Sequence, residues 1–256
     1  MQEIKFDLGK DIVETASGSG VPQFSSDNIN GYISYSVNQI PAGIPAHFTR
    51  HDYEIVWQPL FAFTMYADEK RFADRRVQSV DLQLDNKIRS HEAAQAFVEQ
   101  TIAQFAKGKW QRYVDPVWHA MLTGRSSILT EAGQIDTTLS AIDPAYKIPS
   151  EDWLKVMRGT PSWLWVGDGV VAELSCAFDI FKEGEPPVYR MSLEFELLDV
   201  KLKRAAENEA RDLKAGDAKG WNSTAKLAIA KKERAALLRR LEANATKRGD
   251  SVVSKP

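Results

Sequence analysis

The sequence predicts an α+β fold, with antiparallel sheets that carry helices on one face and a basic helix at the C-terminus. Segments of alternating apolar and polar residues indicate half-buried strands. Segments with apolar residues at helical spacing indicate amphipathic helices. The best-defined stretch, residues 162–199, is typical of an antiparallel meander with one solvated face. With 256 residues, 43% of them hydrophobic and 27% charged, the chain can bury a sizeable core.

The N-terminal part is predicted to consist of short strands and loops. Residues 4–8 alternate as in a strand. Residues 14–30 are polar and rich in turn-forming residues, so we expect a loop there. Residues 31–37 alternate as a half-buried strand. The two prolines of residues 41–45 favour a loop, because they remove backbone donors and restrict the residues before them.

Two longer apolar segments follow. Residues 54–66 predict a long strand that is broken or bulged at Pro59, because proline cannot donate to a sheet ladder. Residues 77–84 predict a further strand, with Val80, Leu82 and Leu84 alternating with polar partners.

Three helices are expected in the middle of the chain. Ser90 is placed to cap a helix with an apolar face, and Gly108 is placed to end it. A short helix is expected at residues 116–122. A further helix is expected from residue 150 to about residue 157, where two acidic residues favour its start.

The meander begins with a hairpin. Gly167-Asp168-Gly169 predicts a tight turn after the strand that holds Trp163 and Trp165. A second turn is expected at residues 182–187. The apolar faces of the two strands on either side of that second turn are formed by Val170, Ala172, Leu174, Cys176, Phe178 and Ile180, and by Tyr189, Met191, Leu193, Phe195 and Leu197.

Two helices are predicted at the C-terminus. The first runs from about residue 200 to 214. The second runs from residue 223 to about 247, with Asn222 or Ser223 as its cap and Gly249 beyond its end. This second helix has a narrow stripe of leucine and alanine, and most of its remaining surface is lysine and arginine.

The chain is expected to have three parts. They are residues 1–112 (strands plus a helix), 113–215 (helix, meander and helix) and 216–256 (basic helix and tail), or the three form one continuous domain. Residues 80–84 and the following helix resemble residues 193–197 and the helix after them. The two halves are either pseudo-duplicated, or they look alike because strand–helix units generally do.

The charge distribution is strongly uneven. Residues 1–200 contain 18 Lys and Arg against 28 Asp and Glu, and residues 201–256 contain 15 against 7. The two regions therefore carry net charges of −10 and +8. One interpretation is that the basic helix docks on the acidic body of the same molecule, and another is that it is a solvated helix that packs only through its leucine stripe. A nucleic-acid or membrane-surface role is disfavoured by the acidic body and by the lack of aromatic residues among the basic ones.

No catalytic motif is recognisable. The sequence has no phosphate-binding loop, no dinucleotide fingerprint and no nucleophile elbow, so we expect neither a cofactor nor enzymatic activity. One alternative is a metal-dependent hydrolase that uses His47 and His51, although a helix is doubtful there and we favour surface histidines. Another alternative is an envelope ligand-binding protein that uses Trp163 and Trp165, although packing is the favoured role of this pair.

The compartment is left open by the sequence. Cys176 is the single cysteine, which excludes an intrachain disulfide and fits either the cytosol or the periplasm. No stretch reaches the roughly 18 consecutive apolar residues of a membrane span. An export signal is not recognisable at the N-terminus, so the chain is either intracellular or a mature form that has lost its export signal or tether.

Three segments resemble uncharacterised proteobacterial proteins of type VI secretion effector–immunity loci. They are residues 219–250, the helix that leads into Gly108-Lys109-Trp110, and residues 143–153. The resemblance implies an exported or membrane-tethered protein that binds and neutralises a toxin in the periplasm or cell envelope. It carries no catalytic residues.

The sequence therefore favours a non-enzymatic protein-binding module, most simply an immunity protein. An acidic, aromatic-rich body offers a rigid surface and charge complementarity to a protein partner. We expect no nucleic acid as a partner. The residues expected to contact the partner are acidic ones on and around the meander: Asp168, Glu173, Asp179, Glu194 and Glu196.

Overall fold

The computed structural model describes residues 2–41, 43–84, 87–115, 119–137, 141–179 and 184–253. Its strands are β1 (Ile4–Phe6), β2 (Ser25–Ile29), β3 (Tyr32–Asn38), β4 (Ala46–Phe48), β5 (Ile55–Trp57), β6 (Leu60–Asp68), β7 (Ser79–Leu84), β8 (Gln111–Arg112), β9 (Ser162–Gly167), β10 (Val170–Asp179) and β11 (Val188–Leu197). Its helices are α1 (Ile12–Gly18), α2 (His91–Phe105), α3 (Ser150–Met157), α4 (Leu198–Asp217) and α5 (Ser223–Arg248), with a 3₁₀ turn at Gly124–Ile128.

The strands form two sheets, which confirms the α+β prediction. The main sheet is antiparallel throughout, with the order β2-β3-β6-β7-β11-β10-β9-β8. The small sheet has the order β1-β4-β5, and its β1–β4 pair is parallel. The residues of one hydrophobic core come from positions between Ile4 and Val200 in the sequence. The N-terminal strands and the 162–199 meander therefore share this core.

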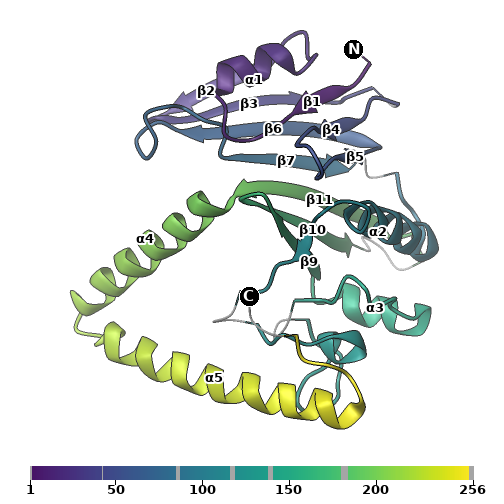
Figure 1. Ribbon diagram of the computed structural model, residues 1–256, viewed down its shortest axis with the longest axis vertical. Coiled ribbons are helices and arrows are strands. Elements are labelled where there is room, and N and C mark those ends of the chain that lie inside the picture. Colours follow the sequence, from purple (N-terminus) through teal and green to yellow (C-terminus); the bar gives the residue numbers. More distant parts are fainter. Residues whose placement is uncertain are drawn as a thin grey trace.

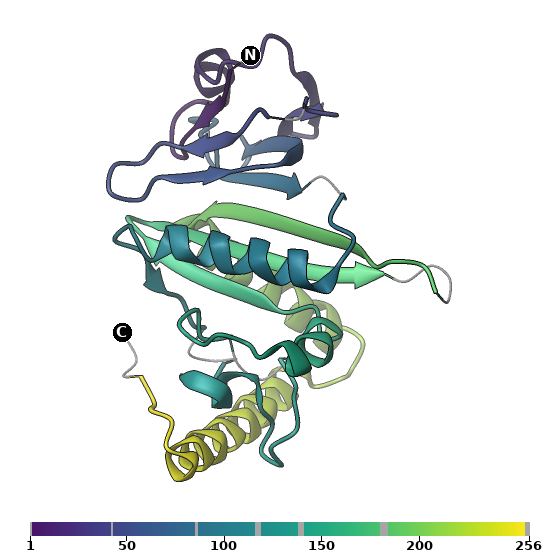
Figure 2. The ribbon, with the colours of Figure 1, turned by 90° about the vertical axis from the view of Figure 1, so that its right-hand side faces the viewer.

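One face of the main sheet, the covered face, packs in the main core. The other face, which we call the open face, is itself partly covered at β9, where Leu164 packs with Val114, Met121 and Ala141. The small sheet packs on the covered face through Phe6 and Phe48, which contact Phe195 of β11. Helix α2 lies across β9, β10 and β11 on the same face (Figure 2), where Phe105 stacks on Trp165 at 3.8 Å between ring centroids. The expectation that helices pack on one face is therefore met by α1, α2 and α3, whose buried residues point into this core.

The two similar strand segments are direct neighbours in the main sheet. Strands β7 and β11 pair antiparallel, with Val80 opposite Phe195 and Leu82 opposite Leu193. Outward from this central pair the sheet continues as β6 and β3 on one side and as β10 and β9 on the other. Two three-stranded antiparallel units, β3-β6-β7 and β11-β10-β9, thus lie symmetrically about the β7–β11 pair.

Two segments of the N-terminal part differ from prediction. Residues 14–30 are not a simple loop, because they contain most of α1 and all of β2. Asp11 caps α1 by accepting hydrogen bonds from the backbone N–H groups of Val13 and Glu14. Strand β2 is an edge strand that is exposed along its whole length, so it has no buried face to impose alternation on its sequence.

Residues 54–66 form two strands in different sheets. Strand β5 belongs to the small sheet and β6 to the main sheet, and the chain passes between them at the cis Gln58–Pro59 bond. A bulge does occur, but it lies inside β6 between Leu60 and Ala62. The missing N–H of Pro59 explains why one continuous ladder cannot include both segments.

The middle helices are partly as predicted. The helices at residues 90–105 and 150–157 are confirmed. Of the helix expected at 116–122, residues 116–118 lie outside the described residues and 119–122 are not helical, since Leu122 forms a bridge with Val252. Gly108 does not cap α2, which ends at Phe105. A side chain at Gly108 would come within 2.9 Å of the Asp52 carbonyl oxygen, so glycine allows this close approach.

The N-cap of α2 provides a stability prediction. Ser90 Oγ accepts a hydrogen bond of 3.1 Å from the Ala93 backbone N–H. Replacing Ser90 with alanine should lower the free energy of unfolding by about 1 kcal/mol, because that N–H then loses its partner. Urea denaturation would measure the loss. Ser17→Ala, on the exposed side of α1, is the control and should change stability by less than about 0.5 kcal/mol; equal losses in both variants would contradict the assigned cap.

Helix α4 leaves the sheet at the end of β11, and α5 then runs back below it and contacts residues of the segment 119–131 (Figure 1). Only Val200 and Gly216 of α4 are buried. The C-terminal half of α5 packs through Leu238, Leu241 and Ala245 on Ala120 and Leu122. Docking of the basic helix within the same molecule is therefore seen for this half, and its contact includes both this apolar cluster and an ion pair of 2.8 Å between Arg240 and Glu131.

The ends of α5 lie where the sequence places them. Asn222 precedes the helix in the left-handed region (φ 50°). Its side chain makes no cap bond; Asp217 instead accepts hydrogen bonds from the Ser223 backbone N–H and from Thr224 Oγ1. Gly249 ends the helix with φ 90°.

Candidate functional site

The open face of the main sheet carries polar side chains on its central strands. Residues of β6, β7, β11 and β10 that point away from the core include Thr64, Asp81, Glu194 and Glu173. Cross-strand register aligns these four side by side, with Thr64 opposite Asp81, Asp81 opposite Glu194, and Glu194 opposite Glu173. Three adjacent strands thus present one carboxylate each in a single row.

We call Asp81, Glu194 and Glu173 the acidic row. Residues directly opposite each other in a sheet have their Cβ atoms about 5 Å apart, and like charges in such pairs are destabilising. Asp81 accepts a hydrogen bond of 3.2 Å from the Gln83 amide. Within the part of the chain that the structure describes, none of the three carboxylates has an ion-pair partner. Among the described residues, the row is therefore a concentration of negative charge without a paired cation.

The surroundings of the row disfavour its charged state. Burial raises the pKa of Asp81 above its ordinary value, and the hydrogen bond from Gln83 only partly opposes this. Burial also raises the pKa of Glu194, and repulsion from Glu196, Glu173 and Asp81 adds to it, while Lys201 acts in the opposite direction.

These pKa shifts predict a pH dependence of stability. Because the folded-state pKa values of Asp81 and Glu194 lie above the unfolded ones, their favourable contribution is fully present below about pH 4 and is lost as pH rises through the folded values. The free energy of unfolding of the wild type should therefore fall relative to the Asp81→Asn/Glu194→Gln variant between about pH 4 and pH 7. Urea denaturation at several pH values measures this difference. A difference that stays constant over the range would contradict the assigned environment.

The structure separates the five acidic residues predicted to contact a partner. Glu173 and Glu194 belong to the acidic row. Glu196 is only 3% exposed and is paired with Arg204 at 3.0 Å and with Lys201 at 3.6 Å. It therefore carries a charge that α4 already neutralises.

The other two predicted contacts are also paired. Asp179 lies at the far end of β10, with its carboxylate 3.0 Å from Arg190 Nε. Asp168 lies in the hairpin turn, where Arg50 Nη1 donates to its carbonyl oxygen at 2.7 Å and is 3.5 Å from its carboxylate. Two of the five are therefore left with an unpaired negative charge on the open face.

Asp81 is the member of the site that sequence reasoning missed. The alternation of residues 77–84 placed it on the polar side of a strand, and the resemblance to residues 193–197 aligned it with Glu194. What the sequence does not supply is that these two strands pair directly, with Asp81 opposite Glu194.

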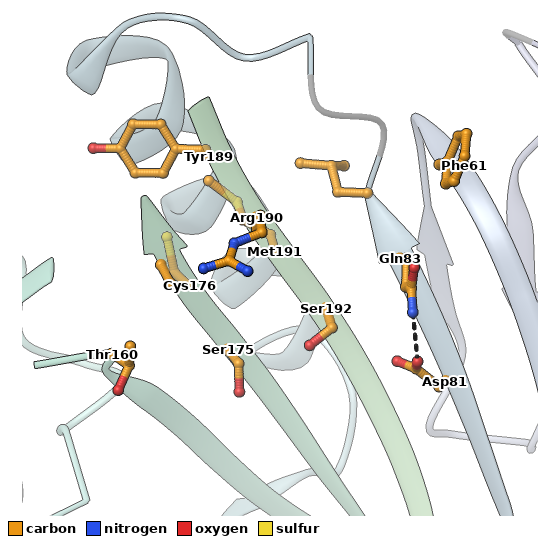
Figure 3. Close-up of a pocket in the computed structure, with 12 residues that line it drawn as sticks. Phe61, Asp81, Gln83, Thr160, Ser175, Cys176, Tyr189, Arg190, Met191 and Ser192 are labelled. Atoms are coloured by element: carbon orange, nitrogen blue, oxygen red, sulfur yellow. Dashed lines mark hydrogen bonds between the residues drawn. The ribbon is translucent and has the colours of Figure 1, made fainter. Parts of the chain in front are cut away.

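A pocket adjoins the acidic row where β7 ends. Among the described residues, strand β11 pairs with β7 from Ser192 to Glu196, and residues 188–191 pair with β10. The pocket opens beside residues 189–192 of β11 and has a volume of about 660 Å³. Figure 3 shows Asp81 and Gln83 on one side and Ser192 and Ser175 on the other. We call it the β7–β11 pocket.

The two histidines considered as metal ligands are not brought into a metal site. His47 lies in β4 and its Nδ1 is 3.4 Å from a Glu3 carboxylate oxygen. The side chain of His51 is 93% exposed, and its nearest carboxylates are those of Asp52 and Glu54 at 3.6 and 3.8 Å. Across the described ranges, no group of three or more His, Cys, Asp or Glu side chains is placed to hold a metal ion. Strand geometry at His47 explains why helical spacing is misleading here.

The tryptophan pair and the cysteine are core residues. Trp163 and Trp165 are 0% and 4% exposed, so neither offers a face to a ligand in solution. Packing is therefore their role. Cys176 is buried, and burial raises the pKa of its thiol to about 12, which keeps it protonated and unreactive.

No protein-family model, no curated protein and no solved structure matches this chain. Separately, the helices of the described residues include none with the length and apolar character needed to cross a membrane.

Proposed function

We propose that this chain is a protein-binding module that holds a basic surface of its partner against the acidic row. The observation that carries the proposal is the row itself: three half-buried carboxylates on adjacent strands without an ion-pair partner in the described structure. A partner that supplies cations removes the repulsion among these carboxylates. The relief of this repulsion makes the free energy of binding more favourable.

The arrangement of the sheet supports this role. The acidic row lies on strands whose other face packs in the main core, so its side chains are held on a rigid support. Phosphate groups would be repelled by this face, which disfavours a nucleic acid as the partner. Binding without catalysis is the role we propose for the chain.

The partner we propose is a secreted antibacterial toxin. This step rests on the resemblance of residues 219–250 to proteins of effector–immunity loci. An immunity protein needs a preformed, complementary surface, and the acidic row fits a toxin with basic residues around its active site. The periplasm or cell envelope is the compartment that this proposal implies.

Complex formation with the product of the adjacent gene tests the proposal. The two proteins would be co-expressed, purified through a tag on one of them, and titrated by calorimetry. We expect a complex with a submicromolar dissociation constant that weakens as salt concentration rises, because salt screens the charges at the edge of the contact. The absence of a complex at micromolar concentrations would contradict the proposal.

A further inference from the structure

The β7–β11 pocket has the dimensions and lining of a site for a side chain rather than for a flat surface contact. Its volume of about 660 Å³ falls in the range of ligand pockets. Phe61 of β6 and Leu84 of β7 form an apolar wall, and Phe61 is 41% exposed there. The carboxylate of Asp81 and the hydroxyls of Ser175 and Ser192 supply polar groups.

The charge balance of the pocket is negative. Arg190 lies at its wall, but its guanidinium is held by both carboxylate oxygens of Asp179, with Nε 3.0 Å from one oxygen and Nη2 donating to the other at 3.2 Å. Asp81 receives a hydrogen bond only from the neutral Gln83 amide and, among the described residues, is not paired with a cation. The uncompensated charge of the pocket is therefore the carboxylate of Asp81, with Glu194 beside it in the row.

The backbone of β11 adds further acceptors. Residues 188–191 of β11 pair with β10 but, in the described part of the chain, have no strand partner on the side of β7. A backbone carbonyl that has no ladder partner can accept a hydrogen bond from a ligand that carries several N–H donors. A guanidinium group has five such donors in one plane, whereas an ammonium group is a compact charge with three.

We propose that the β7–β11 pocket binds the side chain of an arginine from the partner protein, with the guanidinium on Asp81 and the stem against Phe61. This inference rests on the proposed function for the identity of the partner. The pocket itself can be tested without the partner, by using a free alkylguanidinium as the probe.

The experiment is a ligand-detected NMR titration of the full chain with N-propylguanidinium, N-propylurea and butylammonium. N-propylurea has nearly the same shape as N-propylguanidinium but no charge, and butylammonium mimics lysine. We expect N-propylguanidinium to bind with a millimolar dissociation constant and butylammonium to bind more weakly. N-propylurea should bind at least about tenfold more weakly than N-propylguanidinium. Asp81→Asn should weaken the binding of N-propylguanidinium by about tenfold or more, and Phe61→Ala should weaken the binding of all three probes.

The matched control is Asp212→Asn, which removes an exposed carboxylate from α4 and should leave binding unchanged. Equal binding of N-propylguanidinium and N-propylurea, or unchanged binding to Asp81→Asn, would overturn the inference. If the product of the adjacent gene binds but excess N-propylguanidinium does not compete with it, the arginine inference fails while the proposed function stands. If N-propylguanidinium binds through Asp81 but that gene product does not bind, the proposed function fails and the guanidinium site stands.

Discussion

Replacing Phe195 with alanine is expected to lower the free energy of unfolding by about 3–5 kcal/mol. Phe195 is fully buried at the contact between the two sheets. It stacks on Phe48 at 4.6 Å between ring centroids and meets Phe6 edge-on at 5.5 Å. Truncation leaves a cavity where both sheets meet, and neither can close it without moving its strands.

Urea denaturation with a far-ultraviolet signal would measure this loss. The total stability of a domain is about 5–15 kcal/mol, so this loss is a large fraction of it and is well within the range that denaturation measures. Phe61→Ala is the control, because Phe61 is 41% exposed and should cost less than about 1 kcal/mol. A loss below about 1 kcal/mol for Phe195→Ala would contradict the assigned contact between the sheets.

Neutralising the acidic row should make the protein more stable. In the variant Asp81→Asn/Glu173→Gln/Glu194→Gln, the two repulsive cross-strand pairs are removed while the shapes of the side chains are kept. Each like-charged pair costs up to about 1 kcal/mol, so we expect a gain of about 1–2 kcal/mol at neutral pH. Most substitutions destabilise a protein, so a gain at three positions would identify them as functional rather than structural.

A matched variant controls for the change in net charge. Glu14, Glu151 and Asp212 are exposed acidic residues on three different helices. Their joint replacement by Gln, Gln and Asn changes the charge by the same amount, and it should alter stability by less than about 0.5 kcal/mol per site. Thermal and urea denaturation compare the two variants. A loss of stability in the acidic-row variant would show that the carboxylates are compensated after all.

The sequence predicts the strands of this fold better than their arrangement. Alternation identifies β3, β7, β10 and β11, because each has one face in the core and one in solvent. It does not find β2, since an exposed edge strand has no periodic burial. Alternation also does not give the neighbours of a strand, and β7 and β11 pair although more than one hundred residues separate them in the sequence.

Only part of the candidate site could be predicted from the sequence. The acidic character of the meander points to Glu173 and Glu194. Which acidic residues remain uncompensated depends on cations that other elements bring close, such as Arg50 beside Asp168 and Arg204 of α4 beside Glu196. These ion pairs follow from tertiary structure, so spacing in the sequence cannot distinguish a paired carboxylate from a free one.

The affinity for the product of the adjacent gene, measured for three forms of the chain, tests the central claim most directly. The forms are the wild type, the acidic-row variant and the matched variant at Glu14, Glu151 and Asp212. We expect the acidic-row variant to bind at least about 100-fold more weakly than the wild type, since each cation of the partner loses a desolvated counter-charge. The matched variant should bind within about threefold of the wild type, because rim charges contribute little. Equal affinities of the acidic-row variant and the wild type would contradict the claim that this row holds the partner.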